Sequence, residues 1–305
     1  MPILTWALNT PMPAACQGGV LTIGNFDGVH VGHQALLSEA ATQARAARCR
    51  SIAVTFDPHP SQLLRPELVG PPLTTVDDRI ALLQKYGVDH VLILQTSLEL
   101  LQLTARTFFE QIAVGLLHAK ALVEGFNFGF GKDRQGTIDV LRELCSEQGL
   151  KLTLIPPRQV QGVAVSSSRV RSELLAGRVD LVAEMLGRPY RINGMVGTGQ
   201  KRGASLGFPT ANLHSVKTLL PGNGVYAVRV LLEGTTWLGA ANVGPNPTFG
   251  ENERKVEVHL IGFKGDLYGQ TLSVDFVRKI RDTKPFASVR ELSAQIKRDI
   301  DAARK

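Results

Sequence analysis

The stretch Gly24–His33 reads G-N-F-D-G-V-H-V-G-H and separates two segments of different pattern. The residues before it, V-L-T-I, form the apolar run of a buried parallel strand, and Gln34–Ala47 has an alanine-rich helical pattern. The stretch is therefore predicted to be a strand-to-helix turn. Its glycines permit positive φ and let phosphates approach the backbone amides. Because a helix N-terminus offers free N–H groups, the turn predicts a site for a nucleotide's phosphates.

Two histidines lie at the predicted first turn of this helix. His30 and His33 are three residues apart and share one helix face. Imidazoles there can stabilise the charge that builds on an α-phosphate as pyrophosphate leaves, which indicates an adenylyl-transferring site. Helix capping and an H-x-x-H metal pair, with His59 as third ligand, are the alternatives. The glycine pattern, which a phosphate site needs and a zinc site does not, favours the nucleotide.

Length and composition set the class of protein. The chain has 305 residues, of which 44% are hydrophobic, enough for two domains with their own cores. No apolar run approaches the roughly 20 residues that span a bilayer, and no leader pattern opens the chain. Cysteines are isolated and lie outside any C-x-x-C spacing, which is typical of reduced thiols. We expect a cytoplasmic protein without a membrane partner.

The charge is divided unevenly along the chain. Residues 1–186 hold 16 Lys and Arg against 17 Asp and Glu, a net charge of −1, and residues 187–305 hold 18 against 10, a net charge of +8. The basic residues form no dense run and have no interleaved aromatic platform, so no nucleic-acid partner is expected. A positive field also favours an anionic substrate such as ATP.

Strand-like and helix-like segments alternate through the first part of the chain. The predicted strands are 20–24, 51–56, 89–95, 119–124 and 151–156, and the predicted helices are 33–48, 76–86, 104–116 and 137–149. Such alternation predicts an α/β domain with a parallel sheet covered on both faces. Ligands bind at the carboxyl ends of the strands in such sheets. Three unusual segments fall there: Gly24–His33, T-F-D-P-H-P at Thr55–Pro60 and G-F-N-F-G-F-G at Gly125–Gly131.

The third of these segments carries a phenylalanine at every second position. Phe126, Phe128 and Phe130 recur as one face of a strand would. The rings either form a stripe of core residues or sandwich a planar heteroaromatic ligand such as a purine or an isoalloxazine. Asn127 would then be available for hydrogen bonds.

A serine-rich and arginine-containing segment precedes the predicted domain boundary. In Val165–Arg171, V-S-S-S-R-V-R, the serines can cap a short helix, and the arginines have the planar fork that suits phosphate oxygens. Leu174–Leu186 continues as an amphipathic helix, and G-R-P-Y stops it. We therefore predict a first domain over residues 1–186 and a second over residues 187–305.

The second domain has a different pattern of short strands separated by glycine, proline and asparagine. Predicted strands lie near 191–196, 224–232, 236–243, 255–261 and 270–278, and one long helix, Val289–Ala303, follows. This pattern predicts a small antiparallel β-barrel with a C-terminal helix.

A glycine-rich loop in this domain carries Lys201 and Arg202 and runs into G-F-P-T-A-N at Gly207–Asn212. Glycines beside cationic side chains can cradle a polyphosphate through backbone amides. Thr210 and Asn212 supply the hard oxygen ligands that Mg²⁺ prefers. The loop is not a Walker A sequence, and a glycine-rich hairpin of the barrel is the alternative.

The motifs together resemble the bacterial bifunctional riboflavin kinase/FAD synthetase family. The resemblance covers nearly the whole chain, with these motifs in the family's order: G-N-F-D-G-V-H-V-G-H, T-F-D-P-H-P, G-F-N-F-G-F-G, S-S-S-R-V-R, L-G-R-P-Y, L-G-F-P-T-A-N, G-V-Y-A-V, N-P-T-F and D-L-Y-G. It implies a Rossmann-like nucleotidyltransferase domain that transfers AMP from ATP to FMN, and a barrel that phosphorylates riboflavin. The expected partners are ATP, riboflavin, FMN and FAD, and the expected cofactor is Mg²⁺.

The resemblance also assigns roles to residues. In the first domain the catalytic residues would be His30 and His33, and the nucleotide and flavin would contact Gly24, Asn25, Phe26, Asp27, Gly28, Asp57, Asn127, Ser167, Ser168 and Arg171. In the barrel the binding residues would be Gly197, Gly199, Lys201, Gly203, Gly207, Pro209, Thr210 and Asn212, with the last two as Mg²⁺ ligands. Glu257 would be the catalytic base of the kinase.

Glu257 lies in the alternating stretch V-E-V-H-L-I, where an outward, solvated position is the alternative interpretation. A carboxylate there can take the proton of a primary hydroxyl as the bond to the γ-phosphorus forms. Two positions depart from the family's pattern. Ser168 stands where threonine is commoner and keeps the hydroxyl. Asn246 stands where many members have arginine, so any substrate contact that this arginine makes in the barrel would be absent here.

Two other functions fit parts of the sequence. The first is a nucleotidyltransferase that acts on another phosphorylated small molecule, with a non-catalytic barrel. The second is a nonenzymatic RNA-binding protein that uses the basic second domain.

Overall fold

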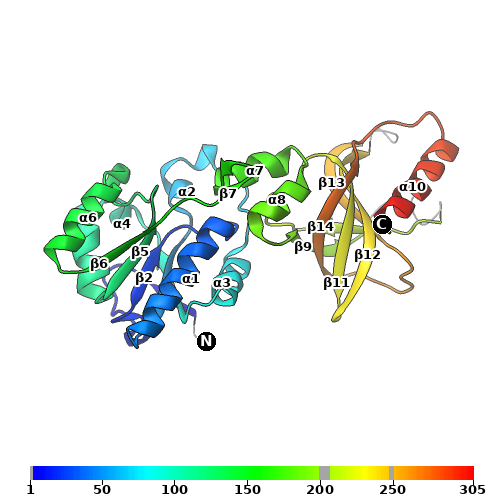
Figure 1. Ribbon diagram of the computed structural model, residues 1–305. Helices are drawn as coiled ribbons and strands as arrows, with labels where there is room; N and C mark the ends of the chain where they lie inside the picture. Colours follow the sequence, from blue (N-terminus) through cyan, green and yellow to red (C-terminus); the bar gives the residue numbers. More distant parts are fainter. Residues whose placement is uncertain (1–2, 199–206, 247–250) are drawn as a thin grey trace. The chain divides into compact units, whose positions relative to one another are not determined.

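The computed structural model describes residues 3–198, 207–246 and 251–305 (Figure 1). These residues form two compact units, each described here by itself. The first unit runs to Gly70 and resumes over Thr74–Ser166, and the second contains Pro71–Leu73 and continues from Ser167. Two helices that precede the predicted boundary at residue 187 therefore belong to the second unit. The extent of each catalytic domain stays a proposal.

The first unit is built on a six-stranded sheet in the order β1-β4-β3-β2-β5-β6. The strands are β1 Ile3–Trp6, β2 Val20–Ile23, β3 Ser51–Asp57, β4 His90–Gln95, β5 Ala121–Gly125 and β6 Lys151–Ile155. Every neighbouring pair is parallel, as the alternating pattern predicts. The four-residue edge strand β1 has no counterpart in the sequence analysis. It pairs with β4, about ninety residues further along the chain.

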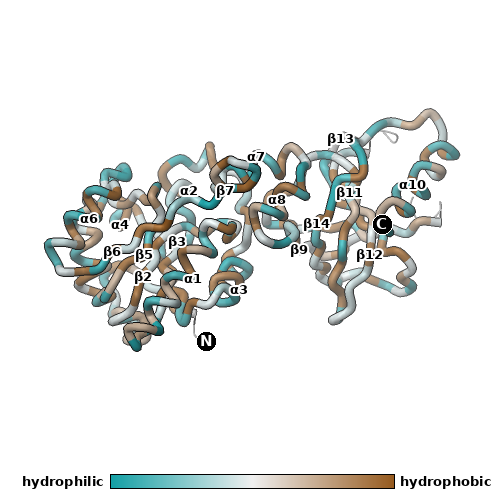
Figure 2. The backbone as a smooth tube through the Cα atoms, viewed as in Figure 1, coloured by the Kyte–Doolittle hydropathy of each residue, from teal (hydrophilic) through white to brown (hydrophobic). Residues whose placement is uncertain are grey.

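Helices cover both faces of this sheet. They are α1 Val31–Ala46, α2 Pro60–Leu64, α3 Val76–Lys85, α4 Leu98–Gln102, α5 Ala105–Phe108, a π-helical segment Phe109–Leu116 and α6 Ile138–Glu147, and a hairpin of β7 Gln159–Val160 and β8 Val163–Ala164 ends the unit. One core cluster joins the sheet to α5, the π-helical segment and α6, and a second joins it to α1 and α3. The predicted coverage of both faces is confirmed, and in Figure 2 the strands of the sheet are largely brown, the hydrophobic colour.

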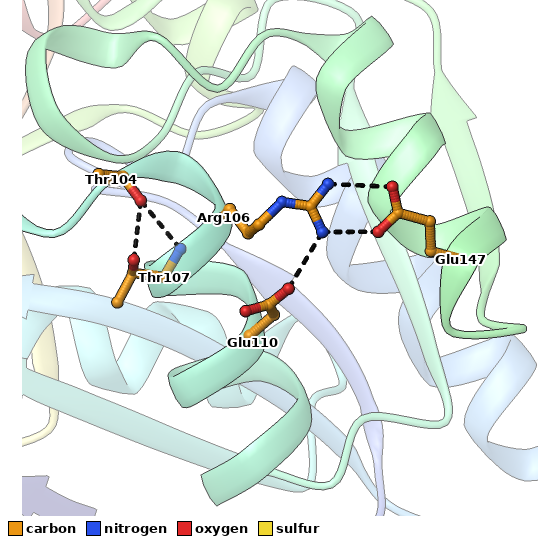
Figure 3. A network of polar contacts seen from close by, with 5 residues as sticks. All are labelled: Thr104, Arg106, Thr107, Glu110 and Glu147. Carbon is orange, nitrogen blue, oxygen red and sulfur yellow. Dashed lines mark hydrogen bonds and ion pairs between the residues drawn. The ribbon is translucent and has the colours of Figure 1, made fainter.

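A surface network of polar contacts links α5 to α6 (Figure 3). The Arg106 guanidinium donates to both carboxylate oxygens of Glu147, at 2.6 and 3.0 Å, and to Glu110 at 3.1 Å. The Thr104 hydroxyl caps α5 by accepting from the Thr107 N–H at 3.1 Å. These side chains are exposed, so they fix the end of α6 from outside the core rather than forming part of it.

The second unit begins with two short helices rather than the one that is predicted over Leu174–Leu186. Helix α7 spans Ser167–Leu175 and α8 spans Val179–Leu186. The chain turns between them at Gly177, whose φ is +77° and where a Cβ would lie 2.8 Å from the Tyr226 hydroxyl. The amphipathic pattern is continuous across the break, which is why it predicts a single helix. Gly187, with a φ of 64°, ends α8 as predicted.

Six antiparallel strands then close into a barrel in the order β10-β13-β12-β11-β14-β9. The strands are β9 Tyr190–Gly197, β10 Ala211–His214, β11 Gly224–Leu232, β12 Thr235–Asn246, β13 Glu251–Leu260 and β14 Thr271–Arg281, and helix α10 spans Val289–Ala303 as predicted. Buried residues line the interior, among them Ile192, Val228, Val258 and Phe276. The predicted barrel is confirmed, and β10 is the strand that the sequence analysis treats as loop.

Gly222 is the point where the chain beside the barrel meets the end of α7. Its N–H donates to the Leu174 carbonyl at 2.8 Å, and a Cβ there would collide with the Leu175 carbonyl oxygen. We expect Gly222→Ala to lower the free energy of unfolding by about 1–3 kcal/mol, because backbone must move to make room. Urea denaturation measures this. Gly70→Ala is the matched control, since Gly70 has open space around it, and equal losses in both variants would contradict the packing argument.

Candidate functional site

The first site begins at the turn between β2 and α1. The Gly24 N–H donates to the Val54 carbonyl at 2.9 Å, which holds the turn against β3. Gly28 has a φ of 81°, and Phe26 and Val29 also have positive φ, at 49° and 41°. Both of these apolar side chains are buried, so they anchor the strained turn in the core. The predicted strand-to-helix turn is confirmed. Phe26, predicted to contact the nucleotide, is placed here as a core residue.

The two histidines form a stacked pair at the start of α1. The ring centroids of His30 and His33 are 3.7 Å apart, with 17° between the ring planes. His30 is the N-cap of the helix, and its Nδ1 accepts from the His33 N–H at 3.3 Å. A neutral His30 ring therefore carries its hydrogen on Nε2. The capping alternative is thus correct for His30.

Burial and the neighbouring His30 hold the pKa of His33 well below its ordinary value. The His33 Nδ1 is buried and has no hydrogen-bond partner among the described residues. Burial and the neighbouring His30 ring both disfavour a positive charge on His33. His33 consequently offers a neutral imidazole at the helix N-terminus.

Asp27 fixes the turn to the segment that precedes α3. Its Oδ1 accepts from the Thr74 N–H at 3.1 Å and from the Thr74 hydroxyl at 3.2 Å. The same hydroxyl accepts from the Gly28 N–H at 3.1 Å. Asp27 is 6% exposed, so its carboxylate is largely occupied in holding the loop. A direct contact between Asp27 and a ligand stays a prediction.

Arg79, which the sequence analysis does not single out, ties two of the predicted loops together. Its guanidinium donates from Nη1 to the Asn25 carbonyl at 2.8 Å and from Nη2 to the Phe56 carbonyl at 3.2 Å. Arg79 is 6% exposed, and this burial lowers its pKa. An arginine within the buried stripe of a helix, beside Ile80 and Leu83, is the sequence signal that could have identified it.

The third loop follows β5 as a turn rather than a strand. The Phe128 N–H donates to the Gly125 carbonyl at 3.0 Å. The rings of Phe128 and Phe130 stack at 5.3 Å and pack on the core, whereas Phe126 is 56% exposed. The core interpretation is therefore correct for two rings, and Phe126 and the exposed Asn127 are the residues left for a ligand.

These three loops lie at one edge of the sheet, because β3, β2 and β5 are neighbours and all run parallel. Asp57, exposed at the end of β3, belongs to the same edge. His59 does not complete a metal site there: its Nδ1 accepts from the Ser61 N–H at 3.1 Å and caps α2. Over the described ranges, no group of three His, Cys, Asp or Glu side chains could hold a metal ion. The metal alternative therefore finds no support.

Glu124 is a buried carboxyl at the point where the strand order reverses. The register between β2 and β5 covers only Val20 with Ala121 and Leu21 with Leu122. Beyond it the Ile23 N–H donates to the Glu124 Oε1 at 2.7 Å, so a side chain replaces the backbone partner. Glu124 is 1% exposed, and burial raises its pKa well above 4.5. The crevice between these strands is where ligands bind in open α/β sheets.

The raised pKa of Glu124 makes stability depend on pH in a definite direction. Folded Glu124 keeps its proton at pH values where the unfolded chain has lost it, so the free energy of unfolding falls as pH rises above about 4.5. Glu124→Gln can accept the same hydrogen bond and does not ionise. As pH rises, we expect the free energy of unfolding of this variant to increase relative to that of the native protein by about 1.4 kcal/mol per pH unit. The increase ends where the folded carboxyl itself ionises.

Urea denaturation at pH 5 and pH 7 measures this gain. Glu143→Gln is the matched control, because Glu143 is exposed on α6. A constant difference between Glu124→Gln and the native protein at the two pH values would contradict a protonated, buried Glu124.

The second site lies on the outer face of the barrel. Asn212 of β10 is directly opposite Glu257 of β13 and, on its other side, opposite Gly197 of β9. The flanking residues Val256 and Val258 point into the interior, at 2% and 0% exposure. Opposed residues of antiparallel strands have Cβ atoms about 4.5–5.5 Å apart. The structure thus brings a predicted metal ligand and the predicted base side by side.

His259, two residues beyond Glu257, holds the loop that leads into β10. Its Nδ1 lies 2.8 Å from the Pro209 carbonyl oxygen, and because a carbonyl only accepts, Nδ1 donates. Phe208 contacts the same ring edge-on at 6.2 Å. Gly207 has a φ of +85° and provides the turn. His259 is a second residue that the sequence analysis does not single out. The sequence signal that could have identified it is the histidine that ends V-E-V-H, two residues after Glu257.

Some predicted site residues are placed elsewhere or not at all. Ser167, Ser168 and Arg171 lie on α7 in the second unit, where the Arg171 Nη1 donates to the Pro71 carbonyl at 2.6 Å. Their proposed closure on a triphosphate stays a prediction. Gly199, Lys201 and Gly203 lie outside the described residues, as does the side chain of Asn246. Thr210 is half-buried and directly precedes β10.

A parallel α/β unit with a glycine-rich turn, joined in one chain to a small closed barrel, is the arrangement of a two-domain nucleotide-using transferase. Family comparison agrees: residues 12–169 match the family described as FAD synthetase, and residues 186–305 match the family described as riboflavin kinase. The chain belongs to the bifunctional riboflavin kinase/FMN adenylyltransferases and carries both catalytic domains of that family.

Individual relatives support this assignment over almost the full length. A bifunctional riboflavin kinase/FMN adenylyltransferase of Pseudomonas fluorescens is 40% identical over 94% of this chain and 93% of its own. Its counterpart in Escherichia coli K12 is 38% identical over 95% and 93%. A crystal structure of a macrolide-efflux protein from Streptococcus pneumoniae has a TM-score of 0.89 and 32% identity, covering 99% of both chains. Within the part of this chain that is described, no helix has the length and apolarity to cross a membrane.

Proposed function

We propose that this chain makes FAD from riboflavin in two ATP-dependent reactions, one in each catalytic domain. The barrel over residues 187–305 would transfer the γ-phosphate of ATP to riboflavin, giving FMN and ADP. The α/β domain over residues 1–186 would then transfer AMP from a second ATP to FMN, giving FAD and pyrophosphate. Family membership supports the pair of reactions, and the observation that carries the assignment of residues is the Asn212–Glu257 register on the barrel.

The adenylyl step needs no covalent enzyme intermediate. An oxygen of the FMN phosphate attacks the α-phosphorus of ATP, and the bond from that phosphorus to the pyrophosphate oxygen breaks. The protein aligns the two anions and stabilises the developing charge. His30 and His33 suit this role because their imidazoles lie at a helix N-terminus, beside the backbone amides of the turn. Phe126 and Asn127 are the exposed groups available to the flavin or the purine.

The kinase step needs a base and a divalent cation. Glu257 would take the proton of the riboflavin primary hydroxyl as its oxygen bonds to the γ-phosphorus and the bond to the ADP oxygen breaks. The hydroxyl of Thr210 and the amide oxygen of Asn212 are hard donors near Glu257, a donor set that fits Mg²⁺. Bound there, Mg²⁺ would neutralise charge on the phosphate oxygens of ATP.

A time course tests the two activities together. Purified chain is incubated with riboflavin, ATP and Mg²⁺, and the three flavins are separated by chromatography. We expect FMN to appear first and then to decline as FAD accumulates. Conversion of supplied FMN alone would confine activity to the α/β domain, and absence of any flavin turnover would overturn the proposal.

Variants separate the two sites. His33→Ala is expected to slow FAD formation from FMN by about a hundredfold while FMN formation from riboflavin continues, since a donor to the developing charge is lost. Glu257→Gln is expected to do the reverse. His118→Ala, at an exposed histidine of the first unit, is the control and leaves both rates unchanged. Loss of kinase activity in His33→Ala with adenylyl transfer intact would show that the two sites are wrongly assigned.

A further inference from the structure

The outer face of the barrel carries a second asparagine beside the proposed base. In the pairing of β12 with β13, Asn242 is directly opposite Glu257. In the pairing of β10 with β13, Asn212 is directly opposite the same Glu257 from the other side. One carboxylate is therefore flanked by two carboxamides on neighbouring strands, and the sequence analysis gives a role to only one of them.

Burial indicates that these three side chains share one face. Asn242 lies between Ala241 and Val243, both fully buried in the barrel interior. Asn242 itself is partly exposed, as are Asn212 and Glu257. Because successive residues of a strand point to opposite faces, the three polar side chains form a row across β10, β13 and β12 on the outside.

We propose that Asn242 is a positioning residue of the kinase reaction, which holds the Glu257 carboxylate by donating hydrogen bonds from its side-chain amide. The inference rests on the proposed function of Glu257 as the base. Asn242 is not itself assigned a contact with riboflavin or ATP.

The chemistry of the three side chains supports different roles for Asn212 and Asn242. A carboxylate has two oxygens, each of which can accept hydrogen bonds. One oxygen takes the proton of the substrate hydroxyl, and the other can accept a hydrogen bond that orients the group. Asn212 is proposed to give its amide oxygen to Mg²⁺. Asn242, on the opposite side, is then the neighbour whose N–H groups can orient Glu257 away from the cation. An amide donor orients the carboxylate without adding a formal positive charge, so it lowers the basicity of Glu257 less than a lysine or arginine would.

The strand framework makes such positioning effective. β12 and β13 pair continuously from Gly239 with Leu260 to Gly244 with Lys255, so the backbone beneath Asn242 and Glu257 is fixed on both sides. A base displaced by about 1 Å can cost on the order of a hundredfold in rate. We therefore expect Asn242→Ala to lower kcat of the kinase by about tenfold to a hundredfold, with a smaller change in KM for ATP.

Asn242→Asp is the decisive variant, because it keeps the size of the side chain and replaces a donor with a second carboxylate. Two opposed carboxylates disfavour ionisation of each other. The acid limb of the kinase pH–kcat profile is expected to move upward by about one pH unit. This shift reports that position 242 lies beside Glu257, and the positioning role of the Asn242 amide is tested by the fall in kcat of Asn242→Ala with little change in KM for ATP.

The matched control is Asn193→Asp on β9. Asn193 is on the same barrel and opposite Ser273, whose hydroxyl donates to its Oδ1 at 2.7 Å. This variant adds the same charge and is expected to leave the kinase pH profile in place. FAD formation from supplied FMN is followed in every variant as a measure of intact protein, and near-native circular dichroism confirms the fold.

The outcomes separate the inference from the function on which it rests. An unchanged pH profile in Asn242→Asp, together with loss of kinase activity in Glu257→Gln, would overturn the role of Asn242 and leave the kinase assignment standing. Full kinase activity in Glu257→Gln would overturn both. An upward shift in Asn242→Asp that is absent in Asn193→Asp is the result we expect.

Discussion

The register of strand pairing is the constraint on which both sites depend. Side chains alternate between the two faces of a strand, so a slip of one residue would move each of them to the other face. In the barrel, the pairing of β13 with β10 and β12 places Glu257 between Asn212 and Asn242 on the outside. In the α/β unit, parallel pairing brings the ends of β3, β2 and β5 to one edge, and with them three loops that are far apart in sequence.

Around the α/β site, burial shifts the pKa values of three ionisable groups. Glu124 is a buried acid whose pKa is raised, and His33 is a partly buried imidazole whose pKa is lowered. The charge of Arg79 is met by two carbonyl oxygens of the loops that it joins. The backbone amides of the turn and the helix N-terminus are the features of this site that suit a triphosphate. This is consistent with a site whose ligand brings its own negative charge and its own cation.

Local patterns predicted most of the longer elements, and three of the exceptions share one cause. Apolar runs that alternate with helical patterns identified five strands of the sheet, and α10 was predicted with its observed bounds. Strands β1 and β10 are four residues each, and they are strands because distant partners pair with them. The break between α7 and α8 follows from Gly177, where a side chain would collide with Tyr226 of the barrel. In each of these three cases a tertiary contact overrides the local signal.

The sequence by itself determined the class of each domain, the family and the motifs near the chemistry, because glycine spacing, hydrophobic periodicity and motif order are local properties of the chain. It also supplied His30, His33 and Glu257 as candidates. Only the tertiary structure decided that His30 caps the helix against His33, that Arg79 and Glu124 lie buried beneath the loops, and that Asn242 is opposite Glu257. These facts depend on pairing and burial between residues up to about a hundred positions apart, as between Ile23 and Glu124, and no local pattern encodes such contacts.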